Sequence, residues 1–458
     1  MDRMVDRLAG TRRSSDPPPK SNGHGGGPVP SPVAPTAIPY TLAETHAVYT
    51  RWLGKEYDLG ALDAVLATAA AERLKGDALW LLIVSGSGNA KTETVQSVAG
   101  DGAILTSTIS SEGALLSASA RRERAKDATG GLLRRLGDRG ILVVKDVTSI
   151  LSMNRDTRAS LLAALREVHD GRWERNVGTD GGRSLLWTGR IVIIGAVTTA
   201  WDRAHDVIAS MGDRFVIVRM DSTGTVGRLS AGRRACRNTG EEEQMRTELA
   251  AAAAGVLATV DPRTVGALTK REQERLLRAA DVVTLARTGV EYDYRGNVID
   301  AHAPEMPTRF LKQLTQMVRG GLAIGLTRSA ALRLAIRCAR DSMPPLRLAI
   351  LDDVAMFPAS QTRDVRKRLE KPRATVDRQL QSLHMLGVLT CAEEEDLHRG
   401  EPVTRWRYRL APGIDPRVLD PNSVPEMSPH MVFGKKKGSR APIPTDISGT
   451  ETEPDERL

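Results

Sequence analysis

The stretch LWLLIVSGSGNAKTE, residues 79–93, decides the fold of this chain. Its first six residues are apolar, which predicts a short strand with both faces buried. A turn of glycine and serine residues follows, and the sequence from residue 91 onward, KTETVQSVAG, is typical of a helix. A strand, a glycine loop and a helix in this order form the context in which a phosphate-binding loop is found.

The loop over residues 85–92 departs from the usual pattern, G-x-x-x-x-G-K-[ST], at both glycines. Lys91 and Thr92 stand where the pattern has them, but Ser85 and Ala90 replace the glycines. Ala90 has a cost if its position needs a positive φ, although its methyl group is too small to block a phosphate. We expect the loop to bind ATP through its backbone N–H groups and the lysine, with a hydroxyl group on Mg²⁺. The residues expected to contact the nucleotide are Gly86, Gly88, Asn89, Ala90, Lys91, Thr92 and Glu93. The alternative is a plain turn with an exposed lysine.

Further apolar runs predict more strands at 141–146, 191–197 and 215–219. Helical stretches at 41–53 and 60–74 precede the first strand, and others separate the strands. This alternation predicts an α/β core with a parallel sheet over residues 40–225. Residues 226–343 are nearly all helical in pattern, with helices expected at 248–257 and 307–323, and they predict a helical lid.

The strand in GILVVKDVTSIL (140–151) ends at Asp146, where a carboxylate that organises Mg²⁺ belongs. In one register Asp146 and Thr92 hold the metal, and the base is missing or comes from elsewhere. In the other register Lys145 takes the metal position and Asp146 is the base. We prefer the first, because a lysine would repel Mg²⁺. A third interpretation is an aspartate that only caps the following turn.

Composition sets limits on the protein class. Aromatic residues make up 3% of the chain, which disfavours binding of single strands by stacked aromatic platforms. The net charge of +9 suits a polyanionic partner. Three scattered cysteines and no apolar run of membrane-spanning length predict a cytoplasmic protein with no membrane partner. The Pro/Gly-rich residues 1–39 and residues 413–458 are expected to be disordered tails.

Residues 344–412 form a small basic block whose pattern is three helices and then a hairpin, the order of a winged helix-turn-helix domain. The hairpin strands are expected at VLTCA and TRWRYRL, around a polar tip EEEDLHRGEP. The third helix has one apolar face, and its other face suits a major groove. The candidate DNA contacts are Arg373, Thr375 and Arg378 on that helix and Arg405 and Arg407 in the hairpin. The alternative is a winged helix that binds protein.

A second hairpin is predicted where RWERNV (172–177) and RSLLWT (183–188) flank the turn residues 178–182. Phosphate contacts would come from Arg172, Arg175, Arg183 and Arg190. The alternative is a packing hairpin in which Trp173 and Trp187 pair across the strands.

With these motifs in order, residues 60–340 resemble an AAA+ ATPase. IVIIGAVTTAWDR (191–203) looks like the strand that carries the sensor-1 residue, which implies Thr198 or Thr199 in that role. SMGDRFVIVRM (210–220) is similar to the segment with an Arg-Phe pair, which implies that Arg214 is the arginine finger for a neighbouring subunit. APEMPTRFLKQL (303–314) implies a sensor-2 role for Arg309. For each arginine the alternative is an ordinary surface ion pair.

Within that family the likeness is to the minichromosome-maintenance helicase group. The alanine before the lysine, the Arg-Phe pair and a winged helix after the lid carry it. Val147 stands where a water-polarising glutamate is usual, and residues 1–40 leave no room for that group's N-terminal DNA-binding region, so we infer a relative and not a member. The resemblance also implies a hexameric ring with the 172–188 hairpin in its channel.

The sequence therefore predicts an ATPase that uses ATP and Mg²⁺ and acts on DNA, with replication proteins as further partners. The leading interpretation is a DNA motor or remodeller, such as a replicative helicase or a replication-initiation ATPase. Two alternatives remain: a DNA-binding regulator that ATP switches with little hydrolysis, and a helicase loader.

Overall fold

The computed structural model of the chain describes residues 38–100, 102–118, 128–178, 181–203, 214–221, 224–398 and 401–425. The tail expected over residues 1–39 therefore falls almost wholly outside the described residues, as do residues 426–458 of the second tail.

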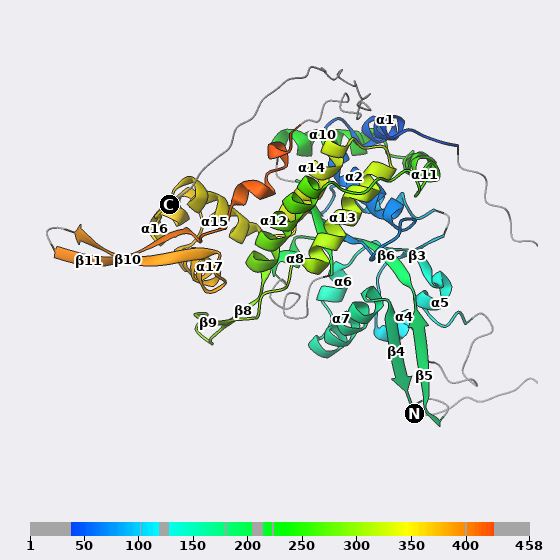
Figure 1. Ribbon diagram of the computed structural model, residues 1–458. Helices are drawn as coiled ribbons and strands as arrows, with labels where there is room; N and C mark the ends of the chain where they lie inside the picture. Colours follow the sequence, from blue (N-terminus) through cyan, green and yellow to red (C-terminus); the bar gives the residue numbers. More distant parts are fainter. Residues whose placement is uncertain are drawn as a thin grey trace, which may run out of the picture. The chain divides into compact units, whose positions relative to one another are not determined.

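A five-stranded sheet is the centre of the fold (Figure 1). Every pair of neighbouring strands in it is parallel, which confirms the α/β class. The strands, in the order in which they lie across the sheet, are β2 (Ala103–Thr106), β3 (Arg139–Val144), β6 (Arg190–Val197), β1 (Trp80–Val84) and β7 (Val216–Arg219). Four of the five match the predicted runs. Sequence reasoning missed β2, because this edge strand is short and only half-buried.

The apolar run of β1 is explained by the two cores that the strand separates. Leu81 and Ile83 belong to one buried cluster, whereas Trp80, Leu82 and Val84 belong to the other. Successive side chains of a strand point to opposite faces, so a sheet that is covered on both sides needs apolar residues at every position. All five residues of β1 are buried.

The elements of the core other than the sheet are short helices and one hairpin. The helices are α1 (Leu42–Leu53), α2 (Leu59–Ala71), α3 (Lys91–Gln96), α4 (Glu112–Leu115), α5 (Leu132–Leu136), α6 (Thr148–Leu151), α7 (Arg155–His169) and α8 (Ala200–Arg203). The hairpin consists of β4 (Arg172–Val177) and β5 (Arg183–Thr188), which are the two strands predicted from the sequence.

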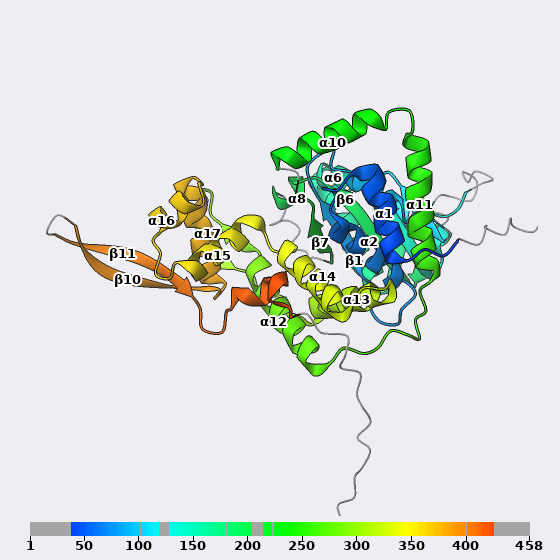
Figure 2. The same ribbon diagram turned by 90° about the horizontal axis from the view of Figure 1, so that it is seen from above.

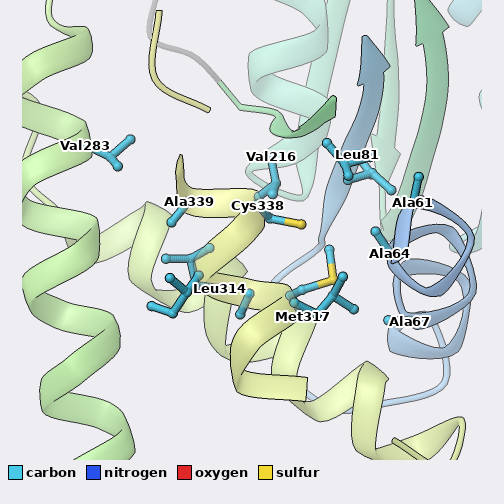
Figure 3. Close-up of a cluster of buried hydrophobic side chains, with 14 of the residues drawn as sticks. Ala61, Ala64, Ala67, Leu81, Val216, Val283, Leu314, Met317, Cys338 and Ala339 are labelled. Carbon is cyan, nitrogen blue, oxygen red and sulfur yellow. The ribbon is translucent and has the colours of Figure 1, made fainter. Parts of the chain in front are cut away.

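Small residues let α2 lie against α13 (Thr308–Ala323) in the core. Figure 3 shows Ala64 and Ala67 on the side of α2 that is turned toward Met317 of α13. A Cβ on Gly320 of α13 would lie 2.0 Å from the carbonyl oxygen of Ala67, so only glycine fits at this crossing. The alanine-rich sequence of α2 thus reflects close helix packing against the sheet.

Residues 226–343, for which a lid is predicted and which we call the lid region, are mostly helical, as predicted, and also contain a small hairpin. Its helices are α10 (Thr225–Arg237), α11 (Glu242–Ala258), α12 (Lys270–Arg287), α13 and α14 (Arg328–Asp341). The hairpin between α12 and α13, which the sequence analysis did not predict, consists of β8 (Val290–Tyr292) and β9 (Val298–Ala301). Its strands are short and carry several charged residues, so neither shows a clear apolar alternation.

The third block has the predicted element order, three helices and an antiparallel hairpin. These are α15 (Pro345–Met356), α16 (Thr362–Arg368), α17 (Arg373–Met385), β10 (Leu389–His398) and β11 (Glu401–Leu410). The acidic run was wrongly placed at the hairpin tip, because Glu393, Glu394 and Glu395 lie within β10. Glu394 accepts hydrogen bonds from Arg407 and Arg409 of β11, at 2.7 Å each. Cross-strand ion pairs therefore extend the strands beyond the apolar segment.

The fold continues past residue 412, where the sequence analysis had placed the start of a disordered tail. Two 3₁₀ helices, η3 (Pro416–Leu419) and η4 (Pro421–Ser423), pack against α12 and α14. Asp415 and Asp420 cap them by accepting backbone N–H groups, and Leu419 is fully buried. One apolar anchor between aspartate caps is enough to order this proline-containing segment.

None of the described helices is long and apolar enough to cross a bilayer. Cys236, Cys338 and Cys391 are free thiols, as expected from their spacing.

The C-terminal anchor makes a prediction for stability. Leu419→Ala should lower the free energy of unfolding by about 2–4 kcal/mol, because it leaves a cavity between η3 and the lid. Urea denaturation measures this, with Leu229→Ala on the exposed face of α10 as a control that should change stability little. Equal stability of the two variants would show that residues 413–425 contribute no packing.

Candidate functional site

The loop after β1 contains two residues in the left-handed backbone region. Gly88 has φ +80°, and Ala90, directly before α3, has φ +53° and ψ 9°. Ala90 thus occupies the position where the usual pattern has glycine, in a conformation that disfavours a Cβ by about 1–2 kcal/mol. The loop keeps the glycine-type backbone although the glycine itself has been lost.

Side chains brace this loop from within. Asn89 Nδ2 donates to Ser85 Oγ at 2.9 Å and to the carbonyl oxygen of Asp221, after β7, at 3.0 Å. Ser85, which replaces the first glycine of the pattern, thereby supplies an acceptor that glycine lacks. Lys91 Nζ donates to the carbonyl oxygen of Gly86 at 3.0 Å, so the ammonium group reaches back across the loop.

Asp146 and Thr198 lie at the same edge of the sheet as the loop. β6 is paired with β1 on one side and β3 on the other, and the carboxyl ends of parallel strands meet at one edge. Burial lowers the pKa of Lys91, and the nearby carboxylate of Asp146 opposes that shift. Thr148, which follows Asp146, accepts the backbone N–H of Thr198 through its Oγ1 at 3.2 Å. The 85–92 loop, Asp146 and Thr198, which belong to three separate sequence motifs, therefore lie at the same edge of the sheet.

The residue after Asp146 points into the core. Val147 is only 5% exposed and belongs to the apolar cluster around β3 and β6, whereas Asp146 itself is exposed. A carboxylate at position 147 would be buried among apolar groups at a high cost. This geometry accounts for the valine and leaves Asp146 as the acidic group that faces the loop.

The residues present fit a magnesium nucleotide. Thr92 in the first turn of α3 and the exposed Asp146 offer the oxygen donors that Mg²⁺ takes. In the described part of the chain no three His, Cys, Asp or Glu side chains gather into a metal site. The phosphates and water would have to complete the coordination, as is usual for Mg²⁺.

Glu93, expected to contact the nucleotide, is paired with the lid. Its carboxylate accepts from Arg246 of α11 through Nε and Nη2, at 3.1 and 3.0 Å. Thr94 Oγ1 lies 2.8 Å from the hydroxyl of Tyr57, before α2. The helix after the loop is therefore fixed by contacts from both α11 and the segment before α2.

Arg214 and Arg309 lie together at the opposite edge of the sheet. Arg214 precedes β7, and Arg309 belongs to the first turn of α13. Arg214 is bonded to Asp170 (3.5 Å) and Arg309 to Glu305 (3.2 Å). A cavity of ≈ 450 Å³ adjoins them, lined by Arg309, His169, Asp170 and residues that precede β1 and β6. Since β1 alone spans about 16 Å, neither arginine shares a site with Lys91 of the same chain.

His169 is a buried group in this second cluster. Its ring packs edge-on against Trp80, with the centroids 5.0 Å apart, and Nδ1 lies 3.2 Å from Asp170. Burial, assisted by the positive charges of Arg214 and Arg309, lowers its pKa to about 4 despite the opposing effect of Asp170. The imidazole is therefore neutral at physiological pH.

The β4–β5 hairpin has the packing role that was the alternative to a DNA contact, at least for part of its arginines. Trp173 and Trp187 are directly opposite one another and buried. Arg175 is bound to Glu112 (2.9 Å) and to the carbonyl oxygen of Leu116 (2.8 Å). Arg190 donates to the backbone of Ala71, Glu72 and Asp77. Of the rest, Arg172 is exposed beside Glu174, and Arg183 is half-buried.

The predicted DNA contacts of the third block are only partly available. Arg373 and Thr375 are exposed in the first turn of α17. Arg378 is exposed too, but its Nε donates to the carbonyl oxygen of Gly296 at 2.7 Å. Arg407 is paired with Glu394, and Arg405 is half-buried on the same strand. Gln379, which follows Arg378, instead faces inward and accepts from the buried Arg347 at 2.9 Å.

Sequence reasoning missed a chain of ion pairs beside the loop. Arg219, the last residue of β7, donates to both carboxylate oxygens of Asp202 in α8, at 3.0 and 2.8 Å. Its backbone N–H and Nε donate to Asp341 of α14, at 2.8 Å each. Arg337 extends the chain to Asp58, the N-cap of α2. The signal in the sequence was the position of Asp202, shortly after Thr198 in the stretch 191–203.

Comparisons with known proteins give no family. No protein-family model and no curated protein matches the sequence. Among solved structures, an apo form of the C-terminal region of NrS-1 shares 10% identity over 82% of this chain and 77% of that chain, with a TM-score of 0.28. A TM-score this low carries no argument about function.

The strained alanine yields a prediction. Ala90→Gly should raise the free energy of unfolding by up to about 1 kcal/mol, because relief of the left-handed strain outweighs the added chain entropy. Thermal denaturation measures the change. Ala99→Gly, at a position without a positive φ, is the control and should destabilise. Destabilisation by Ala90→Gly would contradict the loop geometry.

His169 predicts a pH dependence. Its folded-state pKa of about 4 lies below the ordinary value of 6.5, so the unfolded chain binds the proton more tightly. The stabilisation is complete above pH ~6.5 and is lost as the pH falls toward 4, by at most about 3 kcal/mol. His169→Gln should therefore show a shallower loss of stability over this interval in urea denaturation. Identical slopes would contradict the assignment.

Proposed function

We propose that this protein is an AAA+-type ATPase that acts as a DNA motor or remodeller. The observation that supports this most directly is the convergence of the 85–92 loop, Asp146 and Thr198 at the carboxyl edge of β1, β3 and β6. In parallel α/β sheets, ligands bind outside the carboxyl ends of the strands. The left-handed backbone at Gly88 and Ala90 supports a loop built to turn its N–H groups toward phosphates.

Each residue of the edge has a distinct task in this proposal. Lys91 exchanges its bond to the carbonyl of Gly86 for the β- and γ-phosphates of ATP. Thr92 and Asp146 would hold Mg²⁺, which when bound would supply positive charge beside the phosphates. Thr198, fixed by Thr148, orients the attacking water through its hydroxyl. The ion pair between Glu93 of α3 and Arg246 of α11 couples the lid to the presence of nucleotide in the loop.

A complete site requires two subunits. We assign Arg214 and Arg309 to a nucleotide held by a neighbouring copy, because they lie at the amino edge of the sheet; in that role they would exchange their bonds to Asp170 and Glu305 for the phosphate. A guanidinium group suits this task because it is always charged and donates through a planar fork. Repetition of this head-to-tail contact closes a ring, for which the AAA+ likeness suggests six subunits.

DNA binding is assigned to the third block, which we interpret as a winged helix. Its three helices and hairpin occur in the right order, and α17 exposes Arg373 and Thr375 in its first turn. A basic helix N-terminus of this kind fits the major groove. The β4–β5 hairpin contributes through Arg172 and Arg183, since Arg175 and Arg190 are used in packing.

A nucleotide-switched DNA-binding regulator is the second candidate. The observation in its favour is Val147, whose burial leaves no carboxylate beside Asp146 to polarise water. In that case ATP sets the assembly state and turnover is slow. Tight ATP binding with no phosphate release in the presence of DNA would support the regulator over the motor.

Subunit mixing tests the proposed function. Lys91→Ala and Arg214→Ala should each abolish DNA-stimulated phosphate release. Mixed in equal amounts, they should regain activity, because about one quarter of the interfaces (one half times one half) then pair an intact loop with an intact arginine. Lys145→Ala, a charge-matched control next to Asp146, should stay active.

Two outcomes would contradict this account at different points. If the wild type and Lys91→Ala release phosphate equally slowly on every DNA tested, the proposal of a DNA motor is wrong. If the wild type is active but the mixture stays inactive, the two-subunit site fails.

A further inference from the structure

The β8–β9 hairpin, which the lid inserts between α12 and α13, is seated on α17. Figure 1 shows the hairpin beside α17, on the helix that the proposed function directs toward DNA. In Figure 2 the β10–β11 hairpin extends away from α15, α16 and α17. The first question is how firmly β8–β9 is held there.

Three contacts fix the hairpin to α17. The Nε of Arg378 donates to the carbonyl oxygen of Gly296 at 2.7 Å, and its guanidinium lies 5.6 Å from the ring centroid of Tyr292. The hydroxyl of Tyr292 is 3.3 Å from Ser382 Oγ. Gly296 has φ +82°, and a Cβ there would lie 2.3 Å from Arg378 Nη2. The positive φ of the turn therefore favours glycine, and a side chain here would displace the guanidinium of Arg378.

The turn itself is rigid. The carboxylate of Asp293 accepts the backbone N–H groups of Arg295 and Asn297 at 2.8 Å each, and Asn297 Nδ2 donates to it at 2.8 Å. An aspartate that bonds the backbone ahead of it stabilises a single turn conformation. This arrangement holds residues 294 and 295 outward at fixed positions.

The turn presents an exposed aromatic ring and a cation together. Tyr294 is 88% exposed, and the guanidinium of Arg295 lies 5.1 Å from its ring centroid. A rigid tyrosine with an adjacent arginine is typical of contact surfaces, since it loses little conformational entropy on binding.

We propose that residues 293–297 form a second DNA-contact element that flanks α17, in which Arg295 binds a backbone phosphate and Tyr294 packs against the adjoining sugar. Arg378, aimed by the carbonyl of Gly296, contributes its remaining N–H groups to the same strand. This inference rests on the proposed DNA binding by α17. It makes the lid, and not only the winged helix, part of the DNA site.

The charge around the turn favours a phosphate partner. Lys371, Arg373, Arg378 and Arg295 are all exposed on α17, just before it or on the turn. The carboxylate of Asp293 is occupied by three N–H donors. The other carboxylates of the hairpin, Glu291 and Asp300, lie opposite one another at a position farther from the turn than Tyr292. Glu370 and Asp377 lie next to the basic residues before and on α17. Asp293 and Arg295 balance one another within the turn, so the net positive charge of this surface comes from residues 361–378, which hold seven Lys and Arg against three Asp and Glu.

Duplex binding, followed by fluorescence anisotropy of a labelled DNA over a range of salt concentrations, tests the proposal. Arg295→Ala should weaken binding about fivefold and reduce the salt dependence by about one phosphate contact. Tyr294→Ala should weaken binding about as much with the salt slope unchanged, whereas Tyr294→Phe should retain most of the affinity. Gly296→Ala displaces the turn from Arg378, so it should weaken binding about as much as Arg295→Ala and Tyr294→Ala combined.

Arg263→Ala is the control, since Arg263 is also exposed. It precedes α12 whereas Arg295 follows it, and that helix is about 27 Å long. Arg263→Ala should leave binding unchanged. If Arg373→Ala weakens binding but the variants at 294 and 295 do not, the hairpin inference is overturned and the proposed function stands. If the wild type binds no duplex, both fail.

Discussion

The parallel pairing of β6 with β1 on one side and with β3 on the other is the constraint on which the rest depends. It brings the ends of three strands to one edge, so that a loop, a carboxylate and a threonine meet although they are far apart in the sequence. The same pairing needs apolar residues on both faces, which the two cores satisfy. Folding of the sheet therefore also brings the loop, the carboxylate and the threonine together at this edge.

The common direction of the parallel strands also places the candidate site residues in two groups at opposite edges of the sheet. Lys91 lies at the carboxyl edge, whereas Arg214 and Arg309 lie at the amino edge beside the buried His169. In the proposed function these two clusters form one site only where copies of the chain meet head to tail. Toward the lid, Arg219 links Asp202 to Asp341, and Arg347 joins the end of α12 to α17. Arginine contacts thus join β7 to α8 and α14 in one place and α12 to α17 in another.

Much of the fold could be predicted from sequence because its strands are short apolar runs with helices between them. The loop conformation could be anticipated as well, since an alanine before Lys91 raised the question of a positive φ, which Ala90 has. The β8–β9 hairpin and the long β10–β11 strands could not, because charged residues fill them and cross-strand ion pairs, invisible in a periodicity, hold Glu394 in place. Likewise, no pattern distinguishes Arg373, which is exposed, from Arg378 and Arg175, which bond to the protein itself.

The central claim is that the loop over residues 85–92 holds a magnesium nucleotide despite the loss of both glycines. Isothermal titration calorimetry with Mg²⁺ and a slowly hydrolysed ATP analogue tests it most directly. We expect saturable binding of one nucleotide per chain by the wild type and at least a tenfold weaker affinity for Lys91→Ala, about 1.4 kcal/mol. No binding by the folded wild type, or equal binding by both proteins, would contradict the account.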